Sequence, residues 1–157
     1  MKIGIIVHSQ TGNTYTVAEK LQEMLIALGY SATIEKVTQK SSKPTDVRGV
    51  QLEEKPDSSK YDVLIFGAPV WGFSLSSVMA AYLTQLTSLQ SKKVVCYVTK
   101  ALPFSWTGGY RAISQMKNMV KSKDASVCGS EIILQKSIKD QNNLKAVVES
   151  LCKYITV

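Results

Sequence analysis

The 157-residue sequence lacks an apolar run long enough to cross a membrane. Its longest apolar stretch, VLIFGAPVWGF, is far shorter than the roughly 20 residues that a spanning helix needs. The first residues, MKIGIIVHSQ, share only Lys2 with a secretion leader, because their apolar run is short and no small-residue cleavage site follows. Hydrophobic residues make up 45% of the chain and charged residues 20%, as in globular proteins. The sequence therefore predicts one globular domain, residues 1–157, in the cytoplasm.

Residues suited to metal binding or to acid–base catalysis are scarce. The three cysteines, Cys96, Cys128 and Cys152, have no CxxC spacing, and His8 is the only histidine. Cys96 lies in the apolar run VVCYV, which favours a small buried hydrophobic residue over a metal or redox site. A single histidine without a partner carboxylate or nucleophile is a weak catalytic candidate. We predict no metal site and no catalytic residue, and the unpaired cysteines favour a reducing compartment.

Acidic residues are absent between Val63 and Lys123, a stretch that we call the acid-free segment. The formal net charge is +7, and seven basic residues fall inside this segment: Lys92, Lys93, Lys100, Arg111, Lys117, Lys121 and Lys123. Such a block can bind nucleic acid or can simply be a solvated face. Nucleic-acid binding is the less favoured interpretation, because basic and aromatic residues do not alternate in this segment and it contains no known nucleic-acid-binding motif.

Short β-branched runs alternate with amphipathic patterns along the chain. The alternation predicts an α/β fold with a parallel sheet and right-handed crossovers. The expected strands are 2–7, 32–37, 61–67, 93–98 and 126–134, and the expected helices are 14–28, 77–89, 109–121 and 142–154. Residues 38–60 are polar and poorly periodic, so we expect a long surface connection there, with at most one short helical turn.

Three unusual loops follow the first, third and fourth expected strands, where open parallel sheets bind ligands. The first, SQTGNT (Ser9 to Thr14), has a glycine for a tight turn, three hydroxyl side chains and the N-terminus of the next helix. These groups suit an anion such as a phosphate. The loop is neither GxxxxGK[ST] nor GxGxxG, so nucleotide hydrolysis and dinucleotide binding are disfavoured.

The second and third loops are rich in aromatic residues. GAPVWGFS places Trp71 and Phe73 where the chain is expected to be exposed, and TKALPFSWTGGY adds Phe104, Trp106 and Tyr110. Exposed aromatic residues on facing loops favour a stacking surface for a flat ring. Gly72 allows the Trp71–Gly72 peptide to take either of two turn orientations. Together the three loops predict a site for a flat ring that carries a phosphorylated tail.

The motifs SQTGNT, GAPVWGFS and TKALPFSWTGGY resemble the three FMN-binding loops of the flavodoxin family, and the resemblance covers essentially the whole chain. It implies a flavodoxin-like three-layer sandwich with a five-stranded parallel sheet in the order 2-1-3-4-5. It also implies non-covalent FMN and transfer of electrons between redox partner proteins through one-electron flavin states.

The resemblance also implies roles for individual residues. Ser9, Thr11, Gly12, Asn13 and Thr14 would hold the phosphate, Trp71 would flank the ring, and Gly72 would lie in the peptide that flips when the flavin is reduced. The family usually places a tyrosine over the outer ring face, and here Phe104 or Trp106 would take its place. The residues expected to bind FMN are Ser9, Gln10, Thr11, Gly12, Asn13, Thr14, Pro69, Val70, Trp71, Gly72, Phe73, Thr99, Lys100, Ala101, Phe104, Trp106, Gly108 and Gly109.

The charge of the ring-binding loops departs from the family pattern, in which carboxylates crowd the flavin. Both of these loops lie in the acid-free segment, close to Lys100 and Arg111. We therefore expect a less negative potential for the second electron than in the acidic relatives, and redox partners with acidic docking surfaces.

Two other functions stay open at this point. The first is an FMN-dependent NAD(P)H reductase of quinones or similar small acceptors, because hydride transfer to a flavin needs no general acid. The second is a receiver-like or scaffolding domain without flavin. A receiver would need aspartates after the first and third strands, where this chain has Val7–Ser9 and Gly67–Pro69, so this interpretation is disfavoured.

Overall fold

Five parallel strands form the centre of the molecule in a computed structural model that describes residues 1–40 and 46–156. They are β1 (Lys2–Val7), β2 (Ser31–Lys36), β5 (Val63–Trp71), β7 (Lys93–Lys100) and β8 (Ser126–Leu134). Neighbouring strands pair in the order β2-β1-β5-β7-β8. Counting these five strands in chain order gives 2-1-3-4-5, so the predicted sheet order is confirmed.

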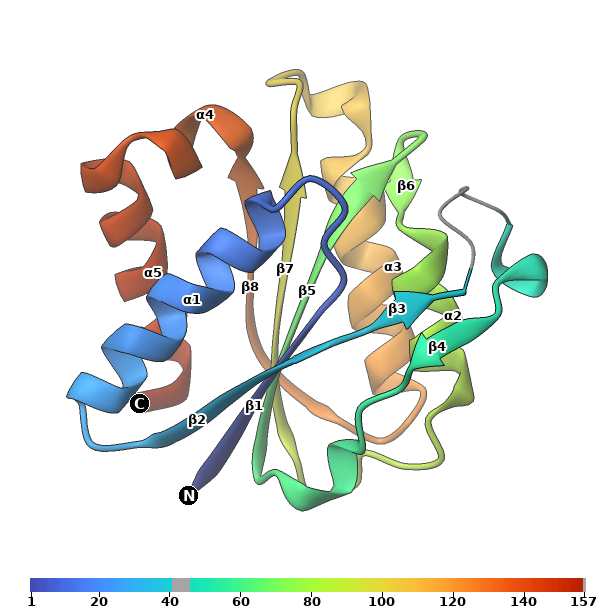
Figure 1. The fold of residues 1–157 in the computed structure, drawn as a ribbon, viewed down its shortest axis with the longest axis horizontal. Helices are drawn as coiled ribbons and strands as arrows, with labels where there is room; N and C mark the ends of the chain where they lie inside the picture. Colours follow the sequence, from blue (N-terminus) through green and yellow to red (C-terminus); the bar gives the residue numbers. More distant parts are fainter. Residues whose placement is uncertain (41–45, 157) are drawn as a thin grey trace.

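Helices cover both faces of this sheet (Figure 1). One layer contains α1 (Asn13–Ala27), α4 (Gln135–Lys139) and α5 (Gln141–Thr156), and the other contains α2 (Ser77–Gln85) and α3 (Gly109–Lys121). Among the described residues, no helix has both the length and the apolar character to span a membrane. The predicted three-layer α/β fold is confirmed.

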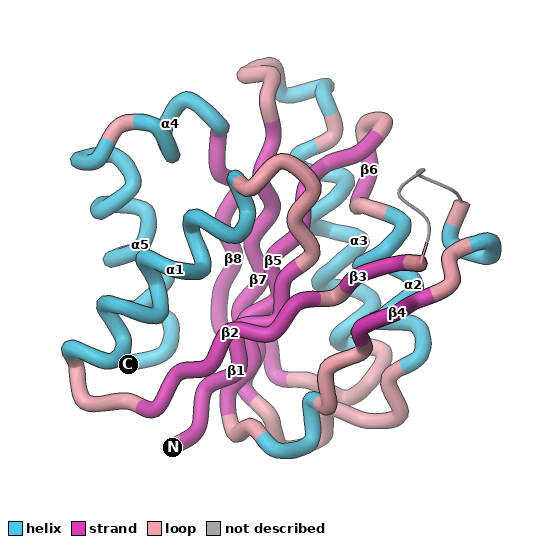
Figure 2. Tube along the Cα trace, in the orientation of Figure 1, coloured by secondary structure: helices cyan, strands magenta, loops and turns pink. Residues whose placement is uncertain are grey.

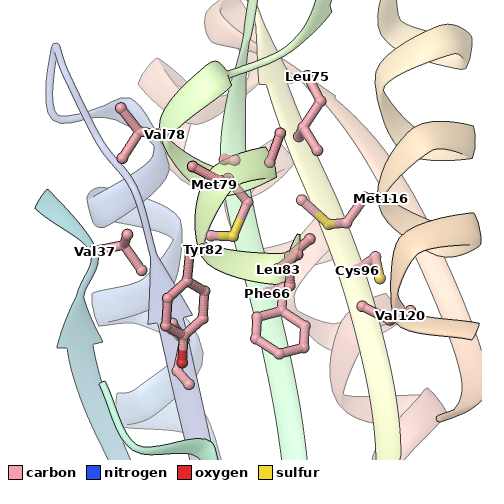
Figure 3. Packing of buried hydrophobic residues seen from close by; sticks show 14 of the residues in the cluster. Val37, Phe66, Leu75, Val78, Met79, Tyr82, Leu83, Cys96, Met116 and Val120 are labelled. Carbon is pink, nitrogen blue, oxygen red and sulfur yellow. The ribbon is translucent and has the colours of Figure 1, made fainter. Parts of the chain in front are cut away.

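Two hydrophobic cores, one on each face, hold the layers together. On the α2/α3 face, Phe66 of β5 packs with Met79 and Tyr82 of α2 and Met116 of α3 (Figure 3). On the α1/α5 face, Leu21 of α1 and Val148 of α5 are completely buried in the second core. The central strand β5 is apolar on both faces, since Leu64 and Phe66 join one core while Val63 and Ile65 join the other.

The connection over residues 38–60 contains more structure than the sequence predicts. It has a short antiparallel pair, β3 (Thr38–Gln39) with β4 (Leu52–Glu54), and two 3₁₀ turns, η1 (Val47–Gly49) and η2 (Ser58–Lys60). Leu52 of β4 is buried in the core of the α2/α3 face, which explains why this polar segment adopts strand structure. Residues 41–45 of this expected connection lie outside the described part of the chain (Figure 2).

Several predicted boundaries are wrong. The second helix ends at Gln85 instead of position 89, because the backbone of Leu86 is already extended. Leu89 lies in the following loop, and its side chain is buried in the core. The third strand runs on to Trp71 instead of ending at Gly67, because it pairs with the unpredicted β6 (Ser74–Leu75). The five-residue helix α4 was not predicted either. The strands 2–7 and 126–134 and the helix 109–121 are confirmed to the residue.

Candidate functional site

The three loops predicted from the sequence meet at the carboxyl ends of β1, β5 and β7, at the top of Figure 2. We call them the cradle loop (residues 9–14), the Trp71 hairpin (residues 69–76) and the aromatic loop (residues 99–110). A cavity of about 230 Å³ opens between them. Residues from all three loops and Gln135 of α4 line it: Gln10, Thr11, Asn13, Pro69, Val70, Trp71, Thr99, Lys100, Ala101 and Gln135.

Gln135 is the one lining residue that the sequence analysis missed. It is the first residue of α4 and follows β8 directly, at the same edge of the sheet as the other three loops. Its position after the last parallel strand was the available signal. A smaller cavity of about 120 Å³ shares Val70, Lys100 and Ala101 with the first cavity, and adds Gly72, Phe73, Leu102 and Thr107.

The cradle loop ends in an open helix N-terminus. Gly12 occupies the N-cap position of α1 with φ 93°, a left-handed conformation that favours glycine. No side chain of the described residues caps the helix at this position, and its first turn contains no acidic residue. Ser9 Oγ accepts a hydrogen bond from the Tyr15 N–H at 3.3 Å, which fixes the loop against the helix. The helix dipole and the N–H groups of Asn13 and Thr14, which precede Tyr15 in the helix, make this end suitable for an anion.

Two buried hydroxyl groups connect the cradle loop to strand β7. Thr14 and Thr99 are 1% and 4% exposed, and their Oγ1 atoms are 2.8 Å apart. The Tyr97 hydroxyl, also buried, donates a hydrogen bond to the Thr14 carbonyl at 2.8 Å. The Thr14 side chain is therefore buried behind the cavity instead of lining it. Through these two hydrogen bonds, strand β7 holds the first turn of α1 in place.

The second loop is a β-hairpin instead of the open loop expected from the sequence. Trp71 and Ser74 pair across it, and both turn residues, Gly72 and Phe73, have positive φ angles of 53° and 65°. Two successive positive φ angles are typical of a type I′ turn, which suits the twist of a hairpin. Gln115 of α3 anchors the returning strand, since its Oε1 accepts a hydrogen bond from the Leu75 N–H at 2.9 Å. The hairpin places the half-buried Trp71 at the cavity wall.

The aromatic loop is held by Lys100 and by a close contact with the hairpin. Lys100 Nζ donates a hydrogen bond to the Phe104 carbonyl at 2.9 Å and lies 3.4 Å from Thr107 Oγ1. Gly108 has φ 97°, and a Cβ atom there would lie 2.3 Å from the Phe73 backbone. Only glycine fits between the two loops at this point, so Gly108 fixes their separation.

Three exposed aromatic rings form a cluster at the rim of the site. Phe104 and Trp106 stack with a centroid distance of 5.7 Å and an interplanar angle of 8°, and Phe73 meets Trp106 at 6.0 Å and 64°. Phe73, Phe104 and Trp106 are 51%, 53% and 70% exposed. Phe104 and Trp106 line neither of the two cavities described above. In this structure the two residues expected to cover the ring thus stack on each other beside the site.

The remaining predicted residues frame the site. In the cradle loop Thr14 is buried, Ser9 is half-buried and Gly12 is exposed, while Gly108 and Gly109 are buried at the start of α3. His8, which the sequence analysis set aside, is buried beside Trp71. Burial lowers the pKa of the His8 imidazole to about 4, so the ring is neutral at physiological pH.

Solved structures of flavodoxins and flavoproteins resemble this chain. Oxidised flavodoxin 2 from Bacillus cereus matches with a TM-score of 0.73 and 16% identity, over 99% of this chain and 98% of that one. Two-electron reduced Megasphaera elsdenii flavodoxin matches with a TM-score of 0.68 and 22% identity, over 96% and 98%. A Lactobacillus acidophilus flavoprotein in complex with FMN matches with a TM-score of 0.62 and 19% identity, over 89% and 97%.

Comparisons with protein-family models and with curated proteins find no match. At these identities, the likeness to solved structures establishes the architecture of the chain. Its strand order and its helical layers give it the same architecture as these flavodoxins. The chain has a flavodoxin-like fold.

Proposed function

We propose that this protein binds FMN and carries single electrons between partner proteins. The observation that carries the proposal is the meeting of an uncapped helix N-terminus and a tryptophan wall at one cavity, on the strand ends where this fold binds ligands. The Lactobacillus acidophilus flavoprotein of the same fold is in complex with FMN. When bound, the flavin would supply the redox chemistry, and the protein would supply binding, orientation and electrostatics.

The residues at the cavity suggest how the cofactor is held. Thr11 and Asn13 line the cavity at the start of α1, where backbone N–H groups and the helix dipole favour a phosphate. The lack of a lysine in the cradle loop fits a phosphate that is held and never transferred. Trp71, Val70 and Ala101 offer apolar walls for the ring, and Lys100 lies in both cavities. Phe104 and Trp106 would need to turn towards the cavity to cover the ring's outer face.

A carrier and an NAD(P)H reductase give different results under anaerobic conditions. We expect photoreduction of the FMN-loaded protein to build up a one-electron-reduced, blue flavin, and we expect NADPH alone to leave the flavin oxidised. Steady oxidation of NAD(P)H with a quinone, in the absence of a separate reductase, would assign the protein to the reductase class instead. A protein that does not retain FMN at all would overturn both assignments.

The rim of the site favours acidic partner proteins. Apolar surface of the kind that forms the centre of protein interfaces is exposed by Phe73, Phe104 and Trp106. Two basic residues lie nearby in the chain, Lys100 in the aromatic loop and Arg111 in α3. An acidic partner would be attracted by this charge and would bury the rings. The three unpaired cysteines support a reducing compartment, and we place the function in the cytoplasm.

Salt dependence tests the sign of the docking surface. The reduced, FMN-loaded protein is mixed with cytochrome b5, which has an acidic surface, or with cytochrome c, which has a basic one. We expect the electron-transfer rate to cytochrome b5 to fall at least about fivefold between low and physiological ionic strength, because attraction between opposite charges is screened. The rate to cytochrome c should not fall. The reverse pattern would show that the docking surface is effectively acidic.

A further inference from the structure

His8 lies between the first strand and the Trp71 hairpin and contacts both. Its backbone N–H donates a hydrogen bond to the Gly67 carbonyl at 3.0 Å, which continues the pairing of β1 with β5. Its imidazole meets the Trp71 indole edge-on, with ring centroids 4.8 Å apart and an interplanar angle of 86°. Its Nδ1 atom is 3.0 Å from Ser76 Oγ. The side chain is 6% exposed, so these contacts are shielded from water.

The hydrogen bonds around Ser76 favour one of the two neutral tautomers of His8. Ser76 is completely buried and is the N-cap of α2, where its Oγ accepts a hydrogen bond from the Met79 N–H at 3.2 Å. A hydroxyl group has a single proton to donate, and the His8 Nδ1 is the acceptor within reach. The neutral tautomer with a bare Nδ1 and a protonated Nε2 is the one that accepts this proton from Ser76.

We propose that His8 is a positioning residue, which the Ser76 hydroxyl orients and which holds the Trp71 indole at the wall of the cofactor cavity. The edge-on contact places the ring of His8 against one side of the indole, while Trp71 also lines the cavity. The helix α2, the hairpin and the cradle loop, which begins at the next residue, are thereby joined through one buried side chain. This role in cofactor binding rests on the proposed function, whereas the contacts themselves do not.

Among the described residues, no charged group contributes to the low pKa of His8. Its hydrogen bonds and ring contact are with the Gly67 carbonyl, the Ser76 hydroxyl and the Trp71 ring, and burial is the cause of its low pKa. Protonation would turn Nδ1 into a donor and would leave the Ser76 proton without its acceptor in a buried site. A charged His8 is thus incompatible with the arrangement that holds Trp71.

Because His8 is the only histidine, NMR of the full chain without cofactor reports its state without assignment by mutagenesis. We expect long-range ¹H–¹⁵N spectra to show protonated Nε2 and bare Nδ1 from pH 8 to pH 5. The opposite tautomer, or a ring that titrates near pH 6.5, would overturn the proposal.

Two substitutions separate the ring from the hydrogen bond, in a Trp106→Phe background that leaves Trp71 as the single tryptophan. His8→Asn keeps an acceptor for Ser76 but removes the ring, and His8→Phe keeps the ring but removes the acceptor. We expect His8→Asn to raise acrylamide quenching of Trp71 at least twofold and to raise the Kd for FMN at least tenfold. His8→Phe should change the quenching constant of Trp71 and the Kd for FMN less. The logarithm of each change should be less than half of that in His8→Asn. Unchanged quenching in His8→Asn would contradict the proposal.

Val148→Ala separates positioning from general loss of stability. It removes buried volume from α5, in the core on the opposite face of the sheet, and should leave Trp71 quenching unchanged. If Val148→Ala raised quenching as much as His8→Asn, the effect would be one of stability and the positioning role would be wrong. If the quenching of Trp71 changes as predicted but the wild-type protein does not bind FMN, the proposed function would be wrong. The positioning of Trp71 by His8 would still be supported.

The pH dependence of unfolding gives an independent readout of His8 burial. The unfolded chain takes up a proton at His8 near pH 6.5, whereas the folded chain does so near pH 4, so lowering the pH between these values favours unfolding. We expect the unfolding equilibrium constant to rise about 30-fold between pH 8 and pH 5 in urea titrations. This rise should be absent in His8→Asn. A pH-independent stability over this range in the wild-type protein would contradict the buried, neutral His8.

Discussion

Replacing Thr11 with glutamate is expected to weaken FMN binding by at least about a hundredfold. Thr11 is exposed at the start of α1 and lines the cavity, so the new carboxylate would face the phosphate without disturbing the core. A negative charge about 5 Å away, at an effective dielectric constant of about 20, costs about 3 kcal/mol for each unit of phosphate charge. Fluorescence titration of the cofactor-free variant with FMN measures the change in Kd.

Thr16→Glu is the matched control for this prediction. It adds the same charge at another exposed residue, in the first turn of α1, but Thr16 is not among the residues lining the cavity. Its hydroxyl only donates a hydrogen bond to the Gly12 carbonyl, at 2.9 Å. We expect the Kd of this variant for FMN to stay within about fivefold of wild type. Equal losses in both variants would mean that net charge, and not a phosphate at the cradle loop, determines binding.

The second large effect concerns the redox potential. We expect the potential for adding the second electron to be less negative than in flavodoxins with acidic loops, because Lys100 lines the cavity and no carboxylate occurs in either ring-binding loop. One unit charge about 10 Å from the ring, at an effective dielectric constant of about 20, contributes about 1.7 kcal/mol, or about 70 mV. Salt screening lowers this value for the exposed Arg111.

Charge reversal measures this contribution directly. Lys100→Glu and Arg111→Glu should each make the second potential more negative in an anaerobic redox titration, with the larger shift for Lys100. Lys100→Gln separates the charge from the hydrogen bond to the Phe104 carbonyl, and should give about half of the Lys100→Glu shift. A wild-type potential as low as in the acidic proteins, unchanged in these variants, would show that the acid-free segment does not act on the flavin.

The parts of the fold that the sequence predicts well are those with strong periodicity. The strand 2–7 and the helix 109–121 match the structure to the residue, because one has an uninterrupted apolar run and the other a clear amphipathic face. The end of α2 was predicted less well, since Leu86 and Leu89 continue an apolar pattern after the helix has stopped. Leu89 lies in a loop and its side chain is buried, so its apolar character continues the spacing of the helix without being part of it.

The sequence predicts the site as a set of loops. The conformations of these loops depend on contacts between distant residues, which cannot be read from the sequence. The third strand was expected to end at Gly67, whereas it continues to Trp71 because β6 returns antiparallel beside it. The turn requires a positive φ at Phe73, which is uncommon for a bulky residue and has no local signal. The pairing of Thr14 with Thr99 joins residues far apart in the chain, so it appears only once the strands are placed.

A parallel titration with FMN and with riboflavin tests the central claim most directly, since the two ligands share the ring and differ in the phosphate. The cofactor-free protein should bind one FMN per chain and should bind riboflavin at least about a hundredfold more weakly, because only FMN reaches the open N-terminus of α1. In the Trp106→Phe background, Trp71 fluorescence should be quenched by the bound ring. Equal affinity for both ligands, or no binding of either, would contradict the assignment of this cavity as a flavin-phosphate site.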